Sequence, residues 1–185
     1  MSQRFLRSAL FLAALFLAPL LLAGQAFAQS APANAQEPQP SVTEKYGDWQ
    51  VICRIARNAD RSAQLCAITQ QKDSAKGQRM LVTELRPNRE GVDGILVLPF
   101  GVAVTKPISL QIDKRSLENR PFHTCIPQGC VVPVEFVGDV FKQLQRGGRL
   151  TVTTPVANGE TASESLSLKG FSKAYDRAKE LTKPL

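Results

Sequence analysis

The residues of this chain whose types and spacing could carry chemistry are four cysteines and one histidine, His123. A thioredoxin-like redox site needs a Cys-x-x-Cys motif, but four residues separate Cys125 from Cys130. A zinc site needs four clustered ligands, and His123 is the single histidine of the chain. We therefore expect all four cysteines, which include Cys53 and Cys66, to be structural, with no metal and no cofactor bound.

The four cysteines form an even set, which is typical of disulfides in an exported protein and allows three pairings. Cys53 and Cys66 lie in two strand-like runs around a polar turn, so a hairpin would bring them opposite each other. Cys125 and Cys130 flank residues 126–129, where Pro and Gly favour a tight reversal. The spacing therefore favours two local disulfides, Cys53–Cys66 and Cys125–Cys130.

No residue stands out as catalytic. A Ser-His-Asp enzyme would need His123 as its base, and the chain has no Gly-x-Ser-x-Gly elbow. His123 lies two residues before Cys125, which favours packing or exposure beside the second disulfide. The acidic residues Asp48, Asp113 and Glu135 are scattered along the chain. The sequence thus predicts a protein that is not an enzyme, and an unrecognised carboxylate-based site is the alternative.

The N-terminus has the pattern of an export signal. Arg4 and Arg7 precede an apolar stretch over residues 9–23, and Ala26-Phe27-Ala28 supplies the small residues at a signal peptidase site. An uncleaved membrane anchor is the rival interpretation, but the stretch is shorter than the roughly 20 residues that span a bilayer. We predict a signal peptide over residues 1–28 and a periplasmic mature protein.

The mature chain is expected to hold one domain. Residues 29–43 consist largely of Pro, Ala and Gln, and such a segment buries too little apolar surface to offset the entropy of ordering it. We predict a flexible tether there and a folded domain over residues 44–185, which is long enough for a proper core.

The charge of the chain is moderately basic. The net charge is +7, and losing Arg4 and Arg7 leaves 21 basic and 16 acidic residues, or +5. The basic residues are spread along the sequence, which is typical of a solvated surface. Peripheral association with an anionic membrane or envelope surface is the other interpretation. Export and the lack of a basic motif interleaved with aromatics predict no nucleic-acid partner.

Short β-like runs separated by turn signals make up most of the domain. Leu110 and Ile112 alternate with polar residues, as in a half-buried strand. Trp49 could be a binding aromatic, but it stands on an alternating run with Val51 and Cys53, which favours a core position. The expected strands cover residues 49–54, 64–70, 80–85, 94–98, 108–112, 120–125, 130–136, 150–153 and 165–168. The pattern predicts a mainly β fold, a single β-sandwich or barrel-like domain.

One or two accessory helices are expected to pack on the strands. Apolar residues recur at helical spacing over residues 136–145, and Gly147-Gly148 would end that helix. Ser172 could cap a C-terminal helix. Five residues would share one face of it: Phe171, Ala174, Tyr175, Ala178 and Leu181.

The order of several short motifs resembles the invasion-associated locus B family of exported bacterial proteins. The resemblance covers residues 44–181, and Phe100 departs mildly from it because the family has an aliphatic residue there. The motifs that carry it are Tyr46-Gly47-Asp48-Trp49 with Cys53, Cys66-Ala67-Ile68, Leu98-Pro99-Phe100-Gly101-Val102, Leu110-Gln111-Ile112-Asp113, Phe122 with Cys125 and Gly129-Cys130, and Leu168-Lys169-Gly170-Phe171.

The resemblance implies a periplasmic or envelope-associated protein and supplies no catalytic residue. We therefore expect a non-enzymatic protein that binds an envelope component or a protein partner. A surface-exposed factor that contributes to host-cell adhesion or invasion is the alternative, and it rests on the resemblance alone.

Overall fold

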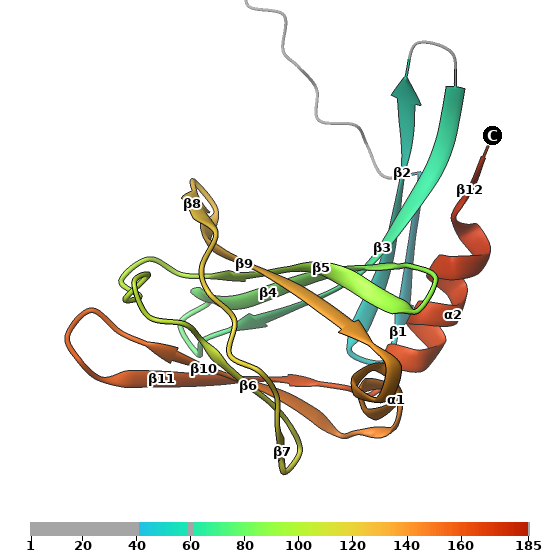
Figure 1. Ribbon diagram of the computed structural model, residues 1–185. Coiled ribbons are helices and arrows are strands. Elements are labelled where there is room, and N and C mark those ends of the chain that lie inside the picture. Colours follow the sequence, from blue (N-terminus) through green and yellow to red (C-terminus); the bar gives the residue numbers. More distant parts are fainter. Residues whose placement is uncertain (1–40, 59–60, 185) are drawn as a thin grey trace, which may run out of the picture. The chain divides into compact units, whose positions relative to one another are not determined.

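The computed structural model describes residues 41–58 and 61–184, and this part of the chain is mainly β (Figure 1). The expected signal peptide (1–28) and residues 29–40 of the expected tether lie outside the described residues. The strands are β1 (Val42–Tyr46), β2 (Trp49–Asn58), β3 (Arg61–Asp73), β4 (Arg79–Pro87), β5 (Gly91–Leu98), β6 (Ser109–Ile112), β7 (Arg115–Ser116), β8 (Thr124–Ile126), β9 (Gly129–Val137), β10 (Arg149–Pro155), β11 (Thr161–Ser167) and β12 (Lys183–Pro184). The helices are α1 (Gly138–Arg146) and α2 (Phe171–Leu181).

The strands form two antiparallel sheets. The larger has eight strands in the order β1-β2-β3-β4-β5-β9-β8, with β12 paired to β3 on the edge opposite β2. The smaller has four strands in the order β11-β10-β6-β7. The prediction of a mainly β, sandwich- or barrel-like domain with one or two accessory helices, including a C-terminal one, is confirmed.

A single hydrophobic cluster unites the two sheets and α2. The alternation expected for the smaller sheet is present, since Leu110 and Ile112 of β6 are buried together with Leu150 and Val152 of β10. Trp49 is fully buried, and its ring packs edge-to-face on Phe171 at 5.1 Å between centroids. The core position expected for Trp49 is thus confirmed.

Helix α1 begins later than the sequence indicates. Phe136 and Val137, which were expected to open the helix, end strand β9, where Phe136 pairs with Val92 and is buried. The chain turns at Gly138, whose φ of +56° suits glycine, and only then becomes helical. The aromatic ring of Phe141 then packs α1 on α2.

The start of α2 also differs from the prediction. Ser172 was expected to cap the helix, but the N-cap residue is Gly170 and it makes no side-chain cap. The Ser172 hydroxyl instead donates a hydrogen bond to Gln145 O at 2.9 Å, which joins α2 to the end of α1. The buried face holds four of the five expected residues, and Leu181 is partly buried.

Strand β1 was not expected, because residues 42 and 43 were assigned to the tether. Val42 and Tyr46 are partly buried against the core, and the whole strand pairs with β2. The ordered domain therefore begins by Val42 and not at Glu44. Neither α1 nor α2, the helices of the described residues, is long and apolar enough to cross a membrane.

Two tight turns from opposite ends of the domain interlock. Gly47, between β1 and β2, and Gly170, before α2, have φ of +60° and +93°. A Cβ atom on Gly170 would overlap the carbonyl oxygen of Tyr46, and one on Gly47 would press on that of Lys169. The backbone N–H of Asp48 donates to Lys169 O at 3.0 Å across this contact. Both turns therefore require glycine for conformation and for space.

Replacing Gly170 tests this contact. Gly170→Ala should destabilise the domain by more than the ~1–2 kcal/mol that a left-handed non-glycine residue costs, because the new Cβ also collides with Tyr46. Gly159→Ala is the matched control, since Gly159 has a φ of +91° and open space around it. Urea denaturation of both variants measures the difference, and equal losses of stability would contradict the interlocking role.

Candidate functional site

Both disulfides favoured by the spacing are present, Cys53–Cys66 between β2 and β3 and Cys125–Cys130 between β8 and β9. Each joins residues that are directly opposite in the antiparallel register. Cys125 is exposed, whereas the other three half-cystines are buried. Residues 59–60, between β2 and β3 in the sequence, lie outside the described residues. No three His, Cys, Asp or Glu side chains cluster as a metal site in residues 41–58 and 61–184.

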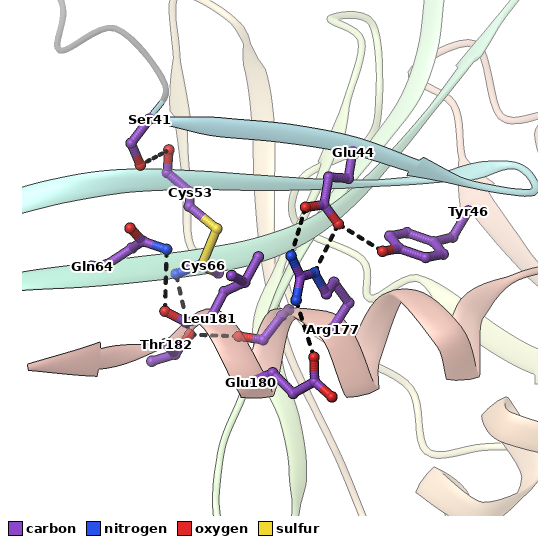
Figure 2. The surroundings of a disulfide bond; sticks show 11 residues. Ser41, Glu44, Tyr46, Cys53, Gln64, Cys66, Arg177, Glu180, Leu181 and Thr182 are labelled. Carbon is purple, nitrogen blue, oxygen red and sulfur yellow. Dashed lines mark hydrogen bonds and ion pairs between the residues drawn. A yellow bond between two sulfur atoms is a disulfide. The ribbon is translucent and has the colours of Figure 1, made fainter.

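The Cys53–Cys66 bond lies between the start of β1 and the end of α2 (Figure 2). The Ser41 hydroxyl donates to Cys53 O at 3.2 Å, and Cys66 N–H donates to Thr182 Oγ1 at 3.3 Å. The Thr182 hydroxyl in turn donates to Ala178 O at 2.8 Å, in the last turn of the helix. The disulfide therefore belongs to a structural junction of three elements.

An ion-pair network ties β1 to α2 beside this junction (Figure 2). Arg177 donates from Nε and from one terminal nitrogen to the two carboxylate oxygens of Glu44, both at 2.9 Å. Its other terminal nitrogen donates to Glu180 at 3.1 Å, and the Tyr46 hydroxyl donates to Glu44 at 2.6 Å. A two-pronged guanidinium–carboxylate pair fixes direction as well as distance, so it orients the edge strand against the helix.

The network shifts the titration of its members. Hydrogen bonds from Arg177 first, and from Tyr46 second, lower the pKa of Glu44 to about 2. The hydrogen bond to Glu44 raises the pKa of the Tyr46 hydroxyl, and the same carboxylate raises the pKa of Arg177. These shifts favour the ionised Glu44, the neutral Tyr46 and the protonated Arg177, which are their ordinary states near neutral pH. Such shifts are typical of a structural ion pair, called the Glu44–Arg177 clasp below, and not of a group that exchanges protons.

The fold does not gather the three scattered carboxylates. Asp48 lies in the β1–β2 turn and Glu135 is exposed on β9, while Asp113 accepts hydrogen bonds from the backbone N–H groups of Gly148 and Arg149. These three acidic residues come from separate elements and serve separate local contacts.

Asp113 does share a surface pocket with a second carboxylate, Asp139. Asp139 is paired with Lys142 at 3.0 Å, and this hydrogen bond lowers its pKa. A general acid needs a raised pKa, so the shift at Asp139 runs opposite to what acid catalysis requires.

His123 lies exposed in the segment before β8, where its backbone N–H donates to Val131 O at 2.9 Å. This placement beside the second disulfide agrees with the expectation of packing or exposure there.

A polar groove is the candidate functional site. It has a volume of about 570 Å³ and lies where the β1–β2 turn, β3 and β11 meet. Its walls carry amides, hydroxyls and three charges and include no aromatic ring. The lining residues are Lys45, Asp48, Gln50, Ile52, Thr69, Gln70, Gln71, Lys72, Ser165 and Ser167.

Two buried side chains fix the floor of this groove. The indole Nε1 of Trp49 and the amide Nε2 of Gln70 both donate to the carbonyl oxygen of Ser167, at 2.9 and 3.0 Å. Trp49 begins β2, Gln70 is in β3, and Ser167 ends β11, so one carbonyl joins the two sheets. Gly47 lies in the chain between the lining residues Lys45 and Asp48, so its close contact with Gly170 holds this end of the groove in place.

Sequence reasoning did not find this groove. Its walls come from three stretches, 45–52, 69–72 and 165–167, that are far apart in the chain and contain no recognised motif. Trp49 was correctly assigned to the core. A buried indole N–H needs a hydrogen-bond acceptor, and this requirement was the one signal in the sequence that Trp49 must contact a polar group of another strand.

The Glu44–Arg177 clasp should make stability depend on pH in the acid range. The lowered pKa of Glu44 contributes stability that is fully present above its ordinary pKa of 4.5 and is lost as the pH falls to about 2. Glu44→Gln should therefore be less stable than the wild type near neutral pH, and the difference should vanish towards pH 2. Urea midpoints across this range measure it. Glu135→Gln, at an exposed carboxylate on β9, is the control: it keeps the Glu44–Arg177 pair, so its urea midpoint should fall with acid as that of the wild type does.

The two disulfides should differ in their contribution to stability. On the chain-entropy relation, the bond between Cys53 and Cys66 spans 13 residues and stabilises by about 3 kcal/mol, whereas the 5-residue Cys125–Cys130 loop gives about 2 kcal/mol. Replacing the first pair by alanine should cost more still, because both cysteines are buried. Denaturant unfolding of the two double variants compares them, and a greater loss for the second pair would contradict the assignment.

Comparison with known proteins places the chain in one group of bacterial proteins. An Invasion protein B homolog of Brucella abortus is 39% identical over 161 residues, which cover 85% of this chain and 88% of that protein. Invasion protein B of Bartonella bacilliformis is 34% identical over 171 residues, which cover 85% and 90% of the two chains.

A solved structure and a family pattern agree with these relatives. The crystal structure of invasion associated protein B from Bartonella henselae matches with a TM-score of 0.68 at 29% identity, over 76% of this chain and 97% of that one. The family described as Invasion associated locus B (IalB) protein matches residues 49–179, which include both disulfides and all the lining residues of the groove except Lys45 and Asp48. The chain therefore belongs to the Invasion associated locus B (IalB) protein family.

Proposed function

We propose that this protein is an exported, envelope-associated binding protein that is not an enzyme and that holds a protein partner or an envelope component in its polar groove. The observation that carries the proposal is the groove itself, whose floor is fixed by the contacts of Trp49 and Gln70 with Ser167. A rigid concave surface that presents several hydrogen-bonding groups is suited to selective binding.

The periplasmic location is supported by the cysteines and by the N-terminal pattern. Both disulfides are formed within short hairpins, and such bonds persist in oxidising compartments. The sequence of residues 1–28 supports export through a cleaved signal peptide.

The non-enzymatic assignment is supported by the charged groups described above. Glu44 and Asp139 are both held in the ionised form by basic partners, Arg177 and Lys142. Within residues 41–58 and 61–184, the two carboxylates with shifted pKa values thus serve as ion-pair members, which is the role of structural residues.

Host-cell adhesion or invasion is the second candidate function. The observation that favours it is the similarity to relatives in Brucella and Bartonella that are named invasion proteins. This role would require the domain to reach the cell surface, whereas the envelope role would not.

In-cell crosslinking of the tagged mature protein tests both candidates. A membrane-permeant crosslinker should capture a partner, and reversing two groove charges with Lys45→Glu and Lys72→Glu should lower the yield roughly three- to tenfold, because charges at the rim of a site steer association. Lys106→Glu with Lys114→Glu is the matched control, since both lysines are exposed and lie outside the groove.

Two results would contradict the proposal: no partner captured in the envelope, or a partner whose yield falls equally in the control variant. A crosslinker that cannot cross the outer membrane separates the two functions. Capture by that reagent on intact cells would favour adhesion, and capture by the permeant reagent alone would favour the periplasmic role.

A further inference from the structure

The free edge of β11 forms one wall of the groove. In the four-stranded sheet β11 is the terminal strand and pairs with β10 alone. Terminal strands present unpaired backbone N–H and C=O groups to whatever lies beside them. The hydrogen-bonding pattern between β10 and β11 shows which residues of β11 direct these groups away from β10.

The ladder shows that the odd-numbered residues of β11 turn their backbone groups away from β10, along the edge on which Ser165 and Ser167 line the groove. Leu168 N–H donates to Gly148 O at 3.0 Å, and Val156 N–H donates to Glu160 O at 2.8 Å, so even-numbered residues exchange hydrogen bonds with β10. Hydrogen-bonded and non-hydrogen-bonded pairs alternate in an antiparallel ladder. Ser163, Ser165 and Ser167 therefore direct their backbone groups away from β10, and the Ser167 carbonyl indeed accepts from Trp49 and Gln70.

Two of these serines have no backbone partner. Among the described residues β11 pairs with β10 alone, the ladder turns the backbone groups of Ser163 and Ser165 away from β10, and no turn or loop hydrogen bond reaches them. Their hydroxyls pair instead with Thr153 and Thr151 on β10, at 2.9 and 3.1 Å. The backbone edge is thus open while the side chains are occupied on the sheet face.

A second free edge borders the same groove. Register places Gln50 opposite Thr69, so β2 begins opposite Gln70, and β3 continues past Gln70 without a partner on that side. The backbone N–H of Cys66 donates to Thr182, which lies on the edge of β3 opposite β2. Backbone groups alternate in direction along a strand, so those of the odd-numbered residues of β3 point towards β2. Gln71, which lines the groove, therefore also turns its backbone groups towards the space that β2 leaves.

We infer that the groove takes an extended polypeptide segment of a protein partner, which adds as a strand along β11 through the backbone groups of Ser163 and Ser165. This inference rests on the proposed function and specifies how the same groove binds. Main-chain hydrogen bonds supply the affinity in strand addition, and side-chain pockets supply the selectivity.

The charges of the groove indicate the kind of segment. Lys45 and Lys72 line it together with one acid, Asp48, and none of the three is in an ion pair within the part of the chain that the structure describes. An acidic segment is complementary to this balance, and a basic one is not. The lining has no aromatic ring on which a sugar could stack, which favours a peptide over a glycan.

A proline substitution separates backbone pairing from every other contact. Ser165→Pro removes the outward N–H and leaves the hydrogen bonds of Glu164 and Leu166 with β10, and proline is tolerated on strand edges of this kind. Ser165→Ala is the matched control, because it loses the hydroxyl pair with Thr151 and keeps the backbone N–H. Urea midpoints of both variants establish that they are folded.

The probe is the synthetic acidic peptide acetyl-Thr-Val-Glu-Val-Glu-Val-Thr-amide, with a lysine-for-glutamate version as its control. Fluorescence anisotropy should show binding to the wild type and to Ser165→Ala within twofold, and at least tenfold weaker binding to Ser165→Pro. The lysine peptide should bind at least tenfold more weakly than the acidic one. No binding to the wild type, or equal binding to the proline variant, would overturn the inference.

Amide hydrogen exchange by NMR gives a second readout that needs no variant. The N–H groups of Ser163 and Ser165 should exchange rapidly in the free protein and slow at least tenfold in the complex, while those of Glu164 and Leu166, already bonded to β10, should change little. Uniform protection would contradict strand addition. Concentration-dependent dimers that Ser165→Pro abolishes would assign the edge to a second copy and overturn the inference.

The outcome separates this inference from the proposed function. The yield of the crosslinked partner could depend on Lys45 and Lys72 and yet be unchanged by Ser165→Pro. That result would support the binding role of the groove and contradict strand addition. Loss of the partner in both variants supports both.

Discussion

The structure depends on the close contact between two glycine turns from opposite ends of the domain. Gly47 and Gly170 bring their backbones so near that neither position has room for a side chain. This contact seats Trp49 in the core against Phe171, because each aromatic residue lies within two positions of one of the turns. The rest of the core then packs around a fixed point where the beginning and the end of the domain meet.

The same contact explains why a groove forms beside it. Trp49 and Gln70 reach one carbonyl of β11, so the two sheets are joined at Ser167 but not along their whole edges. Beyond that joint no strand of the described residues pairs with the backbone groups of Ser163 and Ser165. The two sheets are therefore joined at Ser167 and separate along the rest of β11, which leaves the polar groove between them. The ion pair between Glu44 and Arg177 holds the edge strand β1 against α2 beside this groove.

The strand-rich fold and the C-terminal helix could be predicted from the sequence, because period-two runs such as Ser109–Ile112 and the apolar face of α2 are local signals. The disulfide pairing followed from the same hairpin logic. Strand β1 and the start of α1 could not be placed, since the state of Val42 depends on its pairing with β2 and that of Phe136 on its pairing with the distant strand β5. The groove could not be predicted at all, because it depends on which strand edges remain unpaired after the sheets form.

The Cys53–Cys66 bond has a consequence for the alignment of its hairpin. Sliding β3 by two residues along β2 would keep every apolar side chain on its original face, so hydrophobic patterning alone does not exclude that arrangement. Such a slide would move Cys66 about 7 Å from its partner, and the covalent bond forbids it. It would also move Gln70 away from Trp49, and the two donors would no longer converge on one carbonyl. A covalent bond near the middle of the hairpin thus preserves the alignment of residues at its base.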